Sequence, residues 1–127
     1  MDSPQPNWPA WRVDAAAARS YVVHRKRSVL PVAGWIVDSG VQEVRASQVT
    51  KGLSGQLPTN KVLEALSRLC EIGALDEMPG GGAPHPRVFR RLPRPAYWHF
   101  VAEEVGALKE TTATDQIPVI RAAGSEG

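Results

Sequence analysis

The hydrophobic residues of this chain recur mostly three and four positions apart, a spacing that predicts α-helices. The pattern is clearest between residues 58 and 73, where the apolar side chains fall on one side of a helix: Val62, Leu63, Leu66, Leu69 and Cys70. The polar side chains fall on the other side: Asn60, Lys61, Glu64, Ser67, Arg68 and Glu71. We therefore predict an amphipathic helix from Pro58 or Thr59 to Ile72, closed by Gly73, with one side in the core and the other free to bind.

Two more helices are predicted from residues that commonly begin and end helices. Asp14 can cap a helix of good helix formers over residues 15–26. Ser28 can cap a second helix over residues 29–39. That second helix is expected to stop at Gly40, because glycine readily adopts the left-handed conformation that ends helices.

Shorter elements follow these helices. Residues 41–45 are predicted to form an extended connector, and Ser47 offers an N-cap to one or two helical turns over residues 48–52. Residues 74–78 and 87–92 are predicted to be the two strands of a hairpin, joined by a loop rich in glycine and proline. The alternation in the second strand leaves open whether Val88 or Phe89 points inward.

The length of 127 residues favours a single domain. Pro4, Pro6 and Pro9 exclude a regular helix over the first eleven residues, so this arm is either frayed or pinned by Trp8 and Trp11. Residues after 111 have little core-forming pattern. We therefore divide the chain into an arm (1–13), a domain with flanking helices (14–110) and a flexible tail (111–127).

Composition narrows the class of protein. With 43% hydrophobic and 22% charged residues, the chain matches ordinary globular proteins, and its longest apolar runs are far shorter than a membrane span. The beginning of the chain lacks the features of a secretory signal, so a cytoplasmic, nucleoid-associated location is expected. Cys70 is the only cysteine, which excludes an internal disulfide and a cysteine-cluster zinc site.

Catalytic and metal-binding patterns are weak. The three histidines, His24, His85 and His99, lie far apart in the sequence, and no serine or cysteine has a nucleophile motif around it. Three consecutive glycines (80–82) lack the spacing to a lysine that a phosphate-binding loop needs. We therefore expect no enzyme activity, no cofactor and no metal.

The net charge of +2 conceals an uneven distribution. One basic group lies near the predicted hairpin: Arg87, Arg90, Arg91 and Arg94. A second lies near the predicted first helix: Arg19, Arg25, Lys26 and Arg27. The carboxyl end is acidic. Concentrated positive charge of this kind is typical of nucleic-acid-binding proteins, although it also occurs on solvated surfaces.

The order of these elements resembles the winged helix-turn-helix superfamily. The resemblance covers roughly residues 29–92 and is carried by "RASQVTKGLSGQLPTNKVLEALSRLCEIGALDEMP", the tip "GGGAPHP" and the strand "RVFRRL". In particular, "VLEALSRLCEIGAL" before a hairpin is similar to PadR-like and MarR-like bacterial regulators. The resemblance implies a mainly α protein with a small β-hairpin wing (α+β) and flanking helices. It also implies a sequence-specific, double-stranded DNA-binding protein, a bacterial transcriptional regulator that acts as a homodimer.

The resemblance makes residues 47–52 the positioning helix, 58–72 the recognition helix in the major groove, and 79–92 the wing on the backbone or minor groove. Chemistry agrees: Arg68 can contact a guanine edge with two hydrogen bonds, Asn60 can do the same with adenine, and Glu64 can accept from cytosine. The candidate DNA-binding residues are Ser47, Gln48, Thr59, Asn60, Lys61, Glu64, Arg68, Arg87, Arg90 and Arg91. A polar face is also typical of any surface helix, where Glu64 and Arg68 would simply pair with each other.

The last predicted helix, residues 96–109, has two interpretations. Its larger residues either cover the domain's own core or anchor a dimer interface: Tyr97, Trp98, Val101, Val105 and Leu108. The predicted first helix, or the arm with Trp8 and Trp11, is a further candidate for part of the same interface. Two other functions remain open, a non-catalytic winged helix that docks a protein and an architectural or recombination accessory factor that bends DNA.

Overall fold

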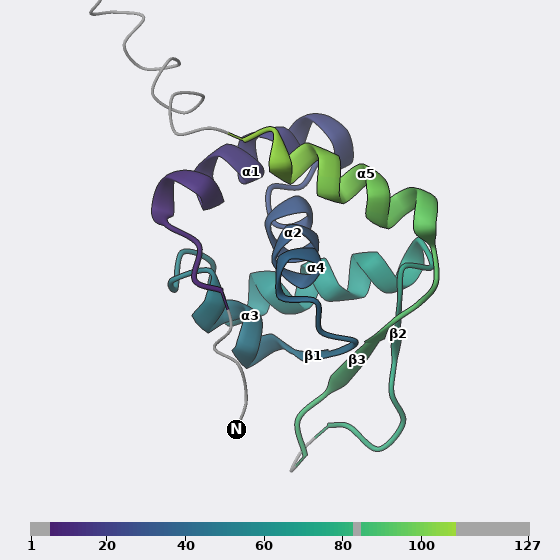
Figure 1. Ribbon diagram of the computed structural model, residues 1–127. Coiled ribbons are helices and arrows are strands. Elements are labelled where there is room, and N and C mark those ends of the chain that lie inside the picture. The colour runs from purple at the N-terminus through teal and green to yellow at the C-terminus, as the bar shows by residue number, and fades with distance from the viewer. Residues whose placement is uncertain (1–5, 83–84, 109–127) are drawn as a thin grey trace, which may run out of the picture.

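The computed structural model of the chain describes residues 6–82 and 85–108. The helices in these ranges are α1 (Ala10–His24), α2 (Val29–Ser39), α3 (Ala46–Gly52), α4 (Thr59–Glu71) and α5 (Pro95–Gly106). The strands are β1 (Glu43–Arg45), β2 (Leu75–Glu77) and β3 (Val88–Arg91), paired antiparallel in the order β1–β3–β2. The expected α+β class, helices with a small β-sheet, is confirmed. Figure 1 shows the helices gathered on one side and the β2–β3 hairpin extending away from them.

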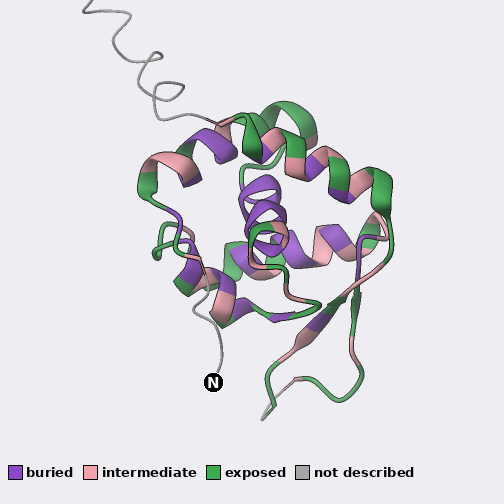
Figure 2. Ribbon diagram, in the orientation of Figure 1, coloured by how far each residue is buried: buried purple, intermediate pink, exposed green. Residues whose placement is uncertain are grey.

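Helix α2 is the centre of the fold. Its residues from Val29 to Ile36 are all buried, which is the pattern of a helix that is hydrophobic on every side. It contacts α1, α3, α4 and α5, and in Figure 2 it is the buried helix in the middle of the molecule. The predicted bounds are confirmed, including the end at Gly40, whose φ is 70°. Ser28 is the N-cap residue, as predicted, but its side chain makes no capping hydrogen bond.

The amino-terminal arm belongs to this core. Only 1% of Trp8 is exposed; its backbone N–H donates to the Gly52 carbonyl (2.8 Å) and its Nε1 donates to the Asp38 carboxylate (3.0 Å). Helix α1 then begins at Ala10, after Pro9 as the N-cap, and Asp14 lies inside it. The predicted cap at Asp14 is therefore wrong. The burial of Trp8 agrees with an arm that is pinned rather than frayed. Proline is compatible with this start because a helix needs no N–H donor there.

Helix α3 also starts earlier than predicted. Arg45, the last residue of β1, is its N-cap, and the Gln48 side chain accepts a hydrogen bond from the Arg45 N–H (2.8 Å). Ser47 is therefore not the N-cap. The extended connector predicted for residues 41–45 contains β1, which pairs with β3.

The hairpin and the last helix follow the predictions with shorter bounds. Phe89 of β3 is buried opposite Val44 of β1, which settles that Phe89 rather than Val88 points inward. Helix α4 ends at Glu71 and Gly73 follows with φ of 81°. Helix α5 ends at Gly106, and both Lys109 and the predicted tail (111–127) lie outside the described residues. Within the described ranges, no helix has the length and apolar character to cross a membrane.

The close approach of α3 to Trp35 allows the packing of the core to be tested at Gly52. A Cβ added at Gly52 would lie 2.0 Å from Trp35 Nε1, and this ring is buried and donates to the Pro6 carbonyl (2.9 Å). We expect Gly52→Ala to lower the free energy of unfolding in denaturant titrations by about 2 kcal/mol or more, because the ring cannot move aside freely.

The control is Gly106→Ala, where an added Cβ meets nothing within 4 Å. This variant should match the wild-type chain or gain slightly, since alanine is the better helix former. Equal stabilities for the two variants would contradict the proposed packing.

Candidate nucleic-acid interface

Helix α4 presents a polar face to solvent. Its inward side is held by Val62, Ala65, Leu66 and Leu69, which are buried. The opposite face is exposed at Thr59, Asn60, Lys61, Glu64 and Glu71 and partly exposed at Ser67 and Arg68. The predicted division of this helix into a core side and a free side is confirmed, with Ala65 as an additional core residue.

The charged side chains on this face pair along the helix. Lys61 Nζ lies 3.7 Å from Glu64 and Arg68 donates to Glu71 at 3.0 Å. The Glu64–Arg68 pair expected for a plain surface helix is therefore not the one that forms. Exposed pairs three residues apart contribute only about 0.2–0.5 kcal/mol each, so a ligand can displace them at little cost.

The hairpin arginines have acidic partners on the neighbouring strands, which charge counted along the sequence does not reveal. Arg87 donates to both carboxylate oxygens of Glu77, at 2.8 and 2.9 Å, and this hydrogen bonding lowers the pKa of Glu77. Arg90 lies 3.6 Å from Asp76 and opposite Glu43 in the sheet register. The positive charge counted along the second strand is thus largely compensated by neighbouring strands.

The other two basic residues of this region contact helices. The Arg91 guanidinium lies over the Trp98 ring, 4.6 Å from its centroid, and burial lowers the pKa of Arg91. Arg94 donates to the Ile72 carbonyl at the end of α4 (3.0 Å). Arg91 therefore joins the hairpin to α5, and Arg94, which is the N-cap of α5, joins the start of that helix to the end of α4.

Two hollows flank the exposed face of α4. One, of about 200 Å³, joins the start of α3, α4 and the hairpin, and its lining includes Arg45, Ser47, Leu63 and Arg87. Of the candidate DNA-binding residues, the structure thus brings Ser47 and Arg87 together beside α4, whereas Gln48 caps α3 and Arg91 packs on α5.

The second hollow, of about 390 Å³, lies between α4 and the turn from α1 to α2. Its lining includes Lys61 and Glu64 from α4 and three consecutive basic residues, Arg25, Lys26 and Arg27, which we call the basic turn. All three are exposed. The charge run is visible in the sequence, but its proximity to α4 is not, because that proximity comes only from the packing of α1 and α2.

Three partly buried polar residues lie near one another: His24 of α1, Arg68 of α4 and Tyr97 of α5. His24 and Tyr97 stack edge to face with ring centroids 6.4 Å apart, and Arg68 lies close enough to affect His24 electrostatically. Burial raises the pKa of Tyr97 to about 12. Burial, and secondly the charge of Arg68, lower the pKa of His24.

The residues predicted as dimer anchors on α5 belong mainly to the chain's own core. Trp98, Val101 and Val105 are 5%, 0% and 2% exposed, and Trp98 Nε1 donates to the Leu92 carbonyl (2.9 Å). These three cannot anchor a partner, so the prediction is wrong for them. Tyr97 and Leu108 are half-buried against the same core.

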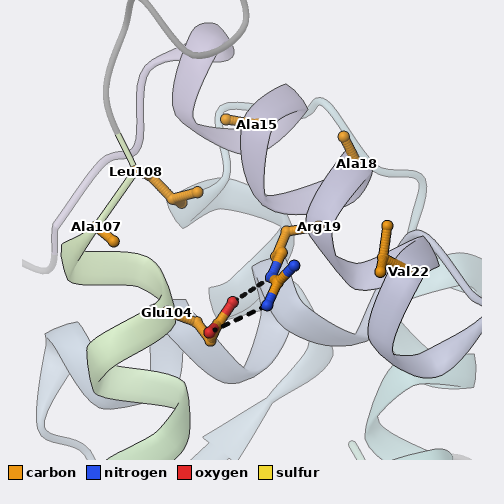
Figure 3. Close-up of a pocket in the computed structure, with 7 residues that line it drawn as sticks. All are labelled: Ala15, Ala18, Arg19, Val22, Glu104, Ala107 and Leu108. Atoms are coloured by element: carbon orange, nitrogen blue, oxygen red, sulfur yellow. Dashed lines mark hydrogen bonds and ion pairs between the residues drawn. The ribbon is translucent and has the colours of Figure 1, made fainter.

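A groove of about 440 Å³ lies instead between α1 and α5. Figure 3 shows Arg19 of α1 and Glu104 of α5 pointing toward each other and forming an ion pair in it. The other lining residues are apolar: Ala15, Ala18, Val22, Ala107 and Leu108. Val22 is 61% exposed at the edge of this groove, whereas its exposed neighbour Tyr21 lines the hollow beside the basic turn.

Comparisons with known proteins add no family. No protein-family model, curated protein or solved structure shows a significant match to this chain. In the described part of the chain, no three metal-ligating side chains come together.

The environment of His24 predicts how stability depends on pH. Because the folded chain holds the pKa of His24 below its unfolded value of about 6.5, the unfolded chain takes up a proton more readily as the pH falls. We expect the free energy of unfolding to decrease as the pH falls below about 6.5, and to decrease less in His24→Gln.

Denaturant titrations between about pH 7.5 and 5.5 measure this difference. His99→Gln is the control, because His99 is exposed and pairs only with Glu103 (3.0 Å). If His24→Gln and wild type lose the same stability over this range, His24 is not the group responsible.

Proposed function

We propose that this chain is a winged helix-turn-helix protein that reads double-stranded DNA with α4 in the major groove. The order α2, β1, α3, α4, β2, β3 supports this, with β1 pairing to the central strand β3 and the β2–β3 hairpin as the wing. The observation that carries the proposal is the exposed polar face of α4, which has a basic turn on one side and the wing on the other. A helix is the element that the major groove admits.

The side chains on α4 suit base edges. Arg68 can contact guanine through two hydrogen bonds and Asn60 can contact adenine in the same way. Arg68 would leave Glu71 to do so, which is inexpensive for an exposed pair. Ser47, at the start of α3, lies where it can contact a phosphate beside the same groove.

The wider proposal is a bacterial transcriptional regulator without enzyme activity or cofactor. A homodimer suits this role, because two copies present their α4 helices to half-sites one helical turn apart. After the correction for Trp98, Val101 and Val105, we place the dimer contact at the α1–α5 groove. A two-fold partner would bring the same apolar surface and the same Arg19–Glu104 pair of opposite charges.

A second candidate function is a winged helix that docks another protein. The observation that favours it is the pairing of Arg87 with Glu77 and of Arg90 with Asp76, which reduces the net positive charge that the wing offers to DNA. Under this alternative, the exposed Tyr21, Val22 and Val23 would meet a different protein.

Whether α4 reads the DNA sequence can be tested with duplexes that the full chain selects from a random pool. On the selected sequence, Asn60→Ala or Arg68→Ala should each weaken binding by about 1–3 kcal/mol and broaden the preferred sequence. His99→Ala is the control, since His99 is exposed on α5, pairs with Glu103 and does not line the α1–α5 groove.

Equal losses on selected and random duplexes would remove the reading role of these two residues. No salt-sensitive binding by the wild-type chain at micromolar concentration would favour the protein-docking function instead.

The dimer contact is tested by Val22→Asp. Because Val22 is 61% exposed, the substitution should leave the monomer folded, while a carboxylate in an apolar interface opposes association. Sedimentation equilibrium should give two chains of 13.8 kDa for wild type and one for the variant.

Gln56→Asp, at an exposed position in the turn before α4, is the control and should remain a dimer. A wild-type chain that sediments as a monomer would contradict the dimer.

A further inference from the structure

A buried serine makes hydrogen bonds to the backbone of the basic turn and to the start of α2. Ser20 of α1 is fully buried; its hydroxyl donates to the Lys26 carbonyl and accepts from the Leu30 N–H (3.0 Å). One side chain thus ties the turn both to α1 and to the first turn of α2. The three cations are therefore presented from a defined backbone rather than from a loose loop.

Arg25 occupies a backbone conformation that favours glycine. Its φ is 61°, in the left-handed region, where it ends α1 with its N–H donating to the Tyr21 carbonyl (2.9 Å). A side chain in this conformation is disfavoured relative to glycine. An arginine at this position is thus poorly explained by helix termination alone.

In the part of the chain that the structure describes, the positive charges of the basic turn are free to bind a ligand, whereas those of Arg87 and Arg90 in the wing are paired with carboxylates. Over residues 6–82 and 85–108, Arg25, Lys26 and Arg27 form no ion pair, whereas Arg87 and Arg90 both do. Lys61 of α4 lines the same hollow, and Glu64 is the single acid in that lining. This hollow therefore gathers four cations against one carboxylate beside the exposed face of α4.

We propose that the basic turn is a phosphate-binding site. It would contact the DNA backbone beside the major groove that α4 enters. The inference rests on the proposed function, because it needs α4 to approach duplex DNA. It assigns the salt-sensitive part of the affinity mainly to Arg25 and Arg27, and a smaller part to the wing arginines, which must first leave Glu77 and Asp76. Contacts of this kind position the protein without reading sequence.

The test compares two variants that lose the same number of arginines. Arg25→Gln with Arg27→Gln removes two charges from the basic turn, and Arg87→Gln with Arg90→Gln removes two from the wing. Binding to a fluorescein-labelled duplex of random sequence is measured by anisotropy at several salt concentrations. Each lost phosphate contact reduces the slope of log K against log salt by about 0.9, so the first variant should lose about 1.8 and the second less than about 0.9.

A slope unchanged in the basic-turn variant, or reduced equally in both variants, overturns the inference while the proposed function stands. If the wild-type chain shows no salt-dependent binding, the proposed function and this inference fail together.

A second variant separates DNA contact from folding. Arg25→Gly relieves the left-handed backbone, so it should raise the melting temperature while weakening DNA binding. A glycine variant that binds DNA as tightly as wild type would count against a phosphate contact by Arg25.

Discussion

The complete burial of α2 is the constraint on which the other elements depend. A helix with the sequence VLPVAGWI in its first eight positions has no polar side to leave in water, so it must be covered on all sides. Four helices and the Trp8 segment provide that cover. Each of them packs its apolar side against α2 or against a neighbour of α2, so its polar side faces outward.

The proposed function uses these outward sides. Helix α4 rests on Val62, Leu66 and Leu69, so its polar face is held in a constant orientation by the core rather than by its own charges. The turn between α1 and α2 is brought next to α4 for the same reason, because both helices pack on one another and α4 packs on α2. The electrostatic surface beside α4 is therefore a consequence of hydrophobic packing.

The sequence predicts those parts of the fold whose signals are local. Helices α2 and α4 were located to within a residue because glycines end them and their apolar positions are unambiguous. The start of α1 was missed because the burial of Trp8 depends on Asp38 and Gly52, which are distant in sequence.

The candidate site also combines features that local sequence predicts with features that depend on packing. The free face of α4 follows from periodicity, so it could be predicted. The partners of the hairpin arginines could not, because charge counted along one strand omits acids on the strands beside it. Likewise, the nearness of Arg25 to Lys61 arises only when α1, α2 and α4 pack together.

The most direct measurement of the central claim, that α4 faces DNA, is a titration of the isotopically labelled chain with duplex DNA, followed by backbone amide chemical shifts. If α4 faces DNA, we expect the largest shift changes on its polar face, at Asn60, Lys61, Glu64 and Arg68, with further changes in the basic turn. Changes confined to the α1–α5 groove, or no changes at micromolar to millimolar concentrations, would contradict it.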